Sequence, residues 1–146
     1  MSSACSGGAE PVVRLGPSGN LFAGLDPGAP AEVFETLASA PGLRIERIVS
    51  TGQHTPPGVY DDQPQTEWVV VLAGAAELEF ADEAAPRRLG PGDYVLIAPH
   101  RRHRVARTAA GTPTVWLALH WGEGVGEDGG EEDGDGTASR RPSTSR

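Results

Sequence analysis

The residues best suited to chemistry are a glutamate and a histidine that lie far apart in the sequence, each in an apolar, strand-like segment. Glu67 opens a nearly continuous apolar run, and His103 shares one face of its segment with Val105. A buried carboxylate is costly unless it binds a metal ion or pairs with a cation, for which Arg47 and Arg104 are candidates. Glu67 is therefore either a metal ligand or part of an ion pair. His103 is either a pocket residue or a hydrogen-bonded core histidine.

Two further histidines and one long loop could add to such a site. His120 lies in the last apolar segment, where a hydrogen-bonded core imidazole is the alternative. His54 lies in a Gly- and Pro-rich loop, where simple exposure is the alternative. Long loops within a compact domain are often functional, and this one also offers Tyr60, Asp61 and Gln63. Tyr60 and Asp61 are the catalytic candidates, because acid–base catalysis needs a titratable group within hydrogen-bond reach of the reacting atom.

The elements that must position these residues are short strands. Alternating or continuous apolar patterns predict strands over 43–50, 67–72, 76–80, 94–98, 102–105 and 114–121. His120 shares its face with Trp116, whereas Arg102 and Arg104 alternate with His103 and are expected on the opposite, solvated face. Short strands separated by Gly-rich turns favour an all-β sandwich or barrel.

One short helix is expected ahead of these strands, over 30–40. It would begin with a proline, which the first turn of a helix tolerates. Val33, Phe34 and Leu37 would form one apolar stripe, and the Pro-Gly pair that follows would end the helix. We expect this helix to lie on a sheet.

Length and composition indicate one domain with loose ends. We expect a disordered N-terminus over 1–11, one domain over 12–121 and a disordered acidic tail over 122–146, because the ends offer little apolar surface. The 146 residues carry a net charge of −8, which argues against a nucleic-acid partner. There is no apolar run of the about 20 residues that span a bilayer. Cys5 is the only cysteine, so an internal disulfide is excluded and a cytoplasmic location is the default.

Two segments resemble the two motifs of the cupin family. Residues 67–74 give a glutamate, six residues and a glycine. Residues 92–103 give Gly-Asp, an apolar strand, a proline-containing turn and a histidine, with His100 where glycine is common. The resemblance covers nearly all of the strand-rich region. It implies a cupin-type β-barrel (double-stranded β-helix or jelly roll), as in small single-domain bacterial cupins, and a homodimer.

The resemblance also implies a site for a divalent metal ion. A typical cupin holds the ion with two histidines and a glutamate of the first motif and a histidine of the second, and by position the last two are Glu67 and His103. The histidine pair is absent, since the places four and six residues before Glu67 hold Gln63 and Asp61, and the places five and seven before it hold Asp62 and Tyr60. The candidate ligands are Glu67, His103, His120, His54, Asp61 and Gln63. Such mixed nitrogen and oxygen donors would suit Fe(II), Mn(II), Zn(II) or Ni(II).

Two functions from different classes fit these residues. The first is a metal-dependent enzyme, whether dioxygenase, isomerase, lyase or hydrolase, acting on a small polar metabolite. The second is a non-catalytic sensor or binding module for a small-molecule ligand, with no metal or a weakly held one, which the loss of the histidine pair favours. The fold does not choose between them, because one fold hosts many functions.

Overall fold

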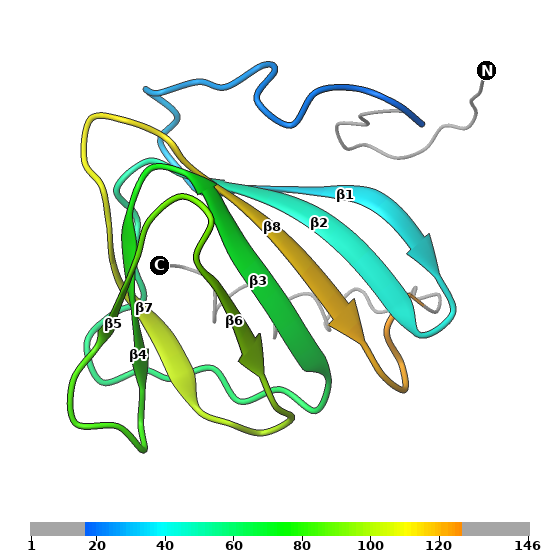
Figure 1. Cartoon of the computed structure of the whole chain (residues 1–146), viewed down its shortest axis with the longest axis vertical. Helices are drawn as coiled ribbons and strands as arrows, with labels where there is room; N and C mark the ends of the chain where they lie inside the picture. Colours follow the sequence, from blue (N-terminus) through cyan, green and yellow to red (C-terminus); the bar gives the residue numbers. More distant parts are fainter. Residues whose placement is uncertain (1–16, 127–146) are drawn as a thin grey trace.

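Antiparallel strands in two sheets make up the structure, a computed structural model that describes residues 17–126. The strands are β1 (Val33–Ala40), β2 (Leu43–Ser50), β3 (Thr66–Ala73), β4 (Ala76–Phe80), β5 (Arg87–Leu89), β6 (Tyr94–Ile97), β7 (His103–Thr108) and β8 (Thr114–Trp121). The larger sheet has the order β1-β2-β8-β3-β6 and the smaller one β5-β4-β7, and Figure 1 shows them facing each other. This arrangement confirms the all-β, cupin-type barrel expected from the sequence. Residues 17–126 contain no helix long and apolar enough to cross a membrane.

The six predicted strands are all present. β2, β4 and β8 have the predicted bounds, and β3, β6 and β7 differ only at their ends. β5 was not predicted from the sequence. It has three residues, of which only Leu89 is buried, so no alternating pattern marks it.

The helix predicted over 30–40 is wrong, because residues 33–40 form β1, which pairs with β2. The Pro-Gly pair expected to end a helix is the two-residue turn between these strands. Gly42 has a φ of +84° there, which favours glycine. Phe34 packs from β1 against the core, and the register of β1 shifts between Thr36 and Ala38. This bulge inserts Leu37, so the apolar residues of the strand acquire a spacing typical of a helix.

The segment before β1 covers the outer face of β2. There the buried side chain of Arg47 makes an ion pair with Glu35 of β1 at 2.5 Å. The same guanidinium donates hydrogen bonds to the carbonyl groups of Leu21 and Ala23. These contacts hold the N-terminal part of the domain on the sheet.

Residues 122–126, which were predicted to belong to a disordered tail, are described by the structure. Residues 122–126 pack on the turn between β1 and β2, where the N–H of Gly42 donates to the carbonyl of Val125 at 2.6 Å. Val125 is only 3% exposed. The rest of the predicted tail, and the N-terminus predicted over 1–11, lie outside the described residues.

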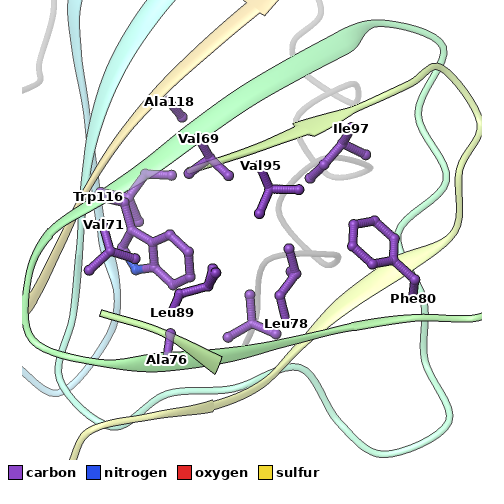
Figure 2. Packing of buried hydrophobic residues seen from close by; sticks show 12 residues of the cluster. Val69, Val71, Ala76, Leu78, Phe80, Leu89, Val95, Ile97, Trp116 and Ala118 are labelled. Carbon is purple, nitrogen blue, oxygen red and sulfur yellow. The ribbon is translucent and has the colours of Figure 1, made fainter. Parts of the chain in front are cut away.

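Apolar side chains of both sheets fill most of the barrel, and Figure 2 shows the larger sheet's Val69, Val95 and Trp116 packed against Leu78 and Phe80 of β4. Trp116 is 2% exposed, and its indole N–H donates to Ser50 Oγ at 3.0 Å. Burying each such side chain contributes roughly 1.5–3 kcal/mol. This cluster is the main source of the fold's stability.

The long loop between β2 and β3 runs along the free edge of β7. The N–H of Thr55 donates to the carbonyl of Val105 at 2.8 Å, and Asp61 and His103 exchange two backbone hydrogen bonds of 2.7 and 3.2 Å. The loop therefore extends the smaller sheet by irregular pairing. Its second contact fixes Asp61 beside the start of β7.

Candidate functional site

The inward-facing positions change from apolar to polar at one end of the barrel. On β3, Glu67 stands one inward position before Val69, and on β8 His120 stands one inward position after Ala118. The register places Glu67 opposite His120, and His120 opposite Arg44 of β2. Directly opposed residues of neighbouring antiparallel strands have Cβ atoms about 4.5–5.5 Å apart. These three side chains therefore form one polar row.

His103 meets this row from the opposite sheet. Its Nε2 atom lies 3.8 Å from Glu67 Oε1 and 3.9 Å from Asp61 Oδ2. The side-chain amide of Gln63 donates to Glu67 Oε1 at 3.0 Å. His103, Asp61 and Glu67 are 4, 7 and 8% exposed. Four of the six predicted ligands thus lie together, and we call Asp61, Gln63, Glu67 and His103 the carboxylate–imidazole group.

The tautomer of His103 is set by its other ring nitrogen. Nδ1 lies 2.8 Å from the carbonyl oxygen of Arg101, so Nδ1 carries a hydrogen, since a carbonyl can only accept. In the neutral imidazole, the lone pair then belongs to Nε2, which faces the two carboxylates. Metal-binding histidines commonly donate their second N–H to a carbonyl in this way, which fixes the ring.

Neither of the arginines considered as partners of Glu67 binds it. Arg47 pairs with Glu35 on the outer face of the larger sheet. Arg104 pairs with Glu79 at 2.6 Å and donates to the Thr55 carbonyl. The prediction that Arg104 is solvated is wrong, because the long loop covers it and leaves it 9% exposed.

His120 stands beside the carboxylate–imidazole group but faces another carboxylate. Its Nε2 atom lies 3.3 Å from Glu46 Oε1, and Arg44 Nε lies 3.6 Å from Glu46 Oε2. We call Arg44, Glu46 and His120 the β2–β8 group. Sequence reasoning missed Arg44 and Glu46, although both share the face of Ile48, a core residue. That alternation along β2 was the available signal.

Tyr60 and His54 lie away from the site. The Tyr60 hydroxyl donates to Glu79 Oε2 at 3.4 Å, and Arg102 stacks over its ring. Because successive side chains of an extended backbone point to opposite faces, Tyr60 faces outward where Asp61 faces inward. His54 is exposed, with Nδ1 near the carbonyl of Thr55. The structure gives neither residue a place near His103.

The hollow beside Glu67 and His103 is small and mainly apolar. It is also lined by Ile48, Val69, Leu78, Ile97, Val105 and Trp116, and only about 10 Å³ of it can take the centre of a water molecule. That is room for about one water molecule. A ligand larger than a water molecule does not fit inside this hollow.

The donor types of the carboxylate–imidazole group fit a divalent cation, although the side chains are not closed around one. Residues 17–126 contain no ready cluster of three His, Cys, Asp or Glu side chains for a metal ion. Metal–ligand distances of about 2.0–2.2 Å place neighbouring ligands about 3–3.5 Å apart. The separations of 3.8 and 3.9 Å at His103 Nε2 exceed this slightly. A small rotation of each carboxylate would bring the oxygens into range.

Comparison with known proteins supports the fold and the family. The search of curated proteins found no match. Among solved structures, a protein from Ralstonia eutropha JMP134, provisionally named a mannose-6-phosphate isomerase, is 52% identical. The match covers 71% of this chain and 96% of that one, with a TM-score of 0.70.

More distant structures share the fold. An RmlC-like cupin from Desulfovibrio desulfuricans is 21% identical over 71% of this chain and 94% of its own, with a TM-score of 0.57. KdgF from Halomonas sp. is 22% identical over 64% of this chain and 82% of its own, with a TM-score of 0.53. The family model described as "Cupin domain" matches residues 48–120, which contain every residue of the carboxylate–imidazole group. The chain belongs to the cupin family.

Proposed function

We propose that this cupin is a metal-dependent enzyme acting on a small polar metabolite, with the cation held by the carboxylate–imidazole group. The observation that carries the proposal is the position of His103 Nε2, which lies 3.8 and 3.9 Å from oxygens of Glu67 and Asp61. One imidazole nitrogen and two carboxylates are a typical donor set for a divalent ion.

The residues around this point have distinct tasks in the proposal. A bound cation would polarise a substrate oxygen or lower the pKa of a bound water. The Arg101 carbonyl keeps the ring of His103 oriented, and Gln63 holds the Glu67 carboxylate. His120 replaces Tyr60 as the acid–base candidate, because it lies opposite Glu67 in the register.

The size of the hollow restricts the ligand. With about 10 Å³ open to the centre of a water molecule, the substrate presents one or two oxygen atoms to the site and keeps its body outside the hollow. A phosphorylated hexose, suggested by the name of the Ralstonia relative, has hydroxyl and carbonyl oxygens for the cation. In this proposal Arg44, whose side chain is 22% exposed on the inner face, contacts the phosphate.

The first experiment is elemental analysis of protein purified without a chelating tag. We expect about one divalent ion per chain, lost in His103→Ala and kept in His54→Ala, a matched control with an exposed imidazole. Interconversion of mannose 6-phosphate and fructose 6-phosphate is then assayed with the metal restored. Wild-type protein that neither contains nor binds a divalent ion would overturn the proposal.

A metal-free binding module is the second candidate, and one observation favours it. In the structure the group's own atoms face one another, with His103 between two carboxylates and Gln63 hydrogen-bonded to Glu67. Binding of a small polar metabolite that survives excess EDTA and is lost in His103→Ala would support this candidate over the enzyme.

The homodimer implied by the resemblance stays a prediction. Tyr94 and Leu96 on the outer face of β6 are 65 and 56% exposed, and the rings of Trp68 and Tyr94 lie 5.6 Å apart. Adjoining apolar side chains of this kind suit a protein interface. Light scattering of wild-type protein and of Leu96→Arg would test whether a second copy binds here.

A further inference from the structure

We infer that this site is adapted to hard divalent cations, Mn²⁺ or Mg²⁺, and that Asp61 and Gln63 weaken the usual advantage of Ni²⁺ and Zn²⁺. The inference rests on the proposed function, since it concerns the same cation. Of the four metals that the sequence left open, it keeps Mn²⁺ as the preferred ion. It also adds Mg²⁺, which was not among them.

The donor set of the group is dominated by oxygen. Asp61 and Glu67 offer carboxylates, Gln63 offers an amide, and His103 offers the single imidazole. Carboxylate and carbonyl oxygens suit Mg²⁺, Ca²⁺ and Mn²⁺, whereas imidazoles suit Zn²⁺, Cu²⁺ and Ni²⁺. A site with three oxygen donors and one nitrogen donor therefore lies toward the hard end of this range.

Backbone hydrogen bonds fix the two residues that supply the extra oxygen donors. Asp61 exchanges two backbone bonds with His103, and the carbonyl of Gln63 accepts from the N–H of His100 at 2.7 Å. His100 has a φ of +63° in this turn. Because the backbone of Asp61 and the backbone of Gln63 are both hydrogen-bonded, the two residues keep their positions next to Glu67.

The chain's other three histidines are not positioned to replace an oxygen donor. Nε2 of His120 lies against Glu46 at 3.3 Å. His54 is exposed, and His100 is exposed with Nδ1 2.8 Å from Asp62 Oδ1. His103 is therefore the single imidazole of the site.

Gln63 can present either of its amide atoms to the site. Its nitrogen now donates to Glu67 Oε1, and a half-turn of the amide would put its oxygen there instead, since the two ends have nearly the same shape. An amide oxygen is a neutral, hard donor. Gln63→Glu would keep an oxygen donor and add a charge, whereas Gln63→His would change the donor to nitrogen.

The test compares metal affinities by calorimetry, using MnCl₂, MgCl₂, NiCl₂ and ZnCl₂ with apo protein. The variant is Asp61→His with Gln63→His, and His54→Ala is the control. We expect the ratio of Ni²⁺ to Mn²⁺ affinity to rise about tenfold or more in the double variant. It should stay unchanged in His54→Ala. The same direction is expected for Zn²⁺ against Mg²⁺.

Two further variants keep the test decisive if the double variant fails to fold, which circular dichroism would show. Gln63→His alone should raise the Ni²⁺ to Mn²⁺ ratio, and Gln63→Glu should raise Mn²⁺ and Mg²⁺ affinity without raising the ratio. A ratio that is the same in wild type and the histidine variants would overturn the inference while leaving the proposed function standing. Wild-type protein that binds none of the four ions would overturn both.

Discussion

The two ends of the barrel interior are built on the same strands and differ in character. At one end, inward positions of β2, β3 and β8 carry Ile48, Val71 and Trp116, all buried in the core. At the other end, two inward positions farther along β3 and β8, the residues are Glu67 and His120. The apolar and polar residues on each strand are four residues apart, or about 13 Å at a rise of about 3.3 Å per residue.

The polar residues at one end of the barrel cannot be explained by greater exposure to solvent. Glu46, Glu67 and His103 are 3, 8 and 4% exposed, so they are nearly as inaccessible as the core residues of the same sheets. Buried polar groups cost stability unless they are well paired. Conflicts of this kind with the simple pattern of a strand concentrate at functional sites.

At the apolar end, Trp116→Ala should destabilise the domain by about 3–5 kcal/mol, because it removes a large buried side chain and leaves a cavity. Urea unfolding measures this effect. Trp121→Ala is the control, since Trp121 is 39% exposed, and an equal loss there would contradict the assignment of the core.

Removal of Glu35 should cost about 3 kcal/mol, because it strips the carboxylate from the buried guanidinium of Arg47. This polar pair lies on the outer face, so Glu35→Ala should not alter cation binding. Thermal unfolding with and without MnCl₂ would show both. A change in the Mn²⁺-induced shift of the melting temperature would mean that the outer and inner polar groups are coupled.

At the polar end, Glu67→Leu should change stability by no more than about 1 kcal/mol in either direction. The loss of a carboxylate with its buried charge offsets the loss of its partners. Cation affinity should fall by about 10-fold to 100-fold or more, since a ligand is gone. Large destabilisation of the metal-free protein would instead mean that Glu67 has a structural role.

The smallest effect is expected at an exposed ion-pair group on the turn after β4. A hydrogen bond from Arg87, followed by one from Arg101, lowers the pKa of Glu83 from 4.5 to about 2. A lowered pKa gives stability that is present above about pH 4.5 and is lost as the pH falls toward 2. Glu83→Gln should therefore be slightly less stable than wild type at pH 7, and equally stable near pH 2. Unfolding curves at both pH values check this, and a constant difference would contradict the ion pair.

Six of the eight strands were predictable from the sequence because of their alternating or continuous apolar patterns. β1 was not, because its bulge at Leu37 and its Pro-Gly turn imitate the spacing and the end of a helix. Glu67 and His103 could be placed together through the family resemblance. The orientation of Tyr60 could not be predicted, since it depends on the path of the loop along β7. The contact of His120 with Glu46 was also missed, because Glu46 lies on the neighbouring strand β2.

The most direct test is X-ray diffraction from crystals soaked in MnCl₂, with data collected for the anomalous signal of manganese. We expect one anomalous peak about 2.0–2.3 Å from His103 Nε2 and within ligand distance of Glu67 and Asp61. Absence of a peak there, in protein that is well ordered and fully exposed to the soak, would contradict the central claim that these side chains form a cation site.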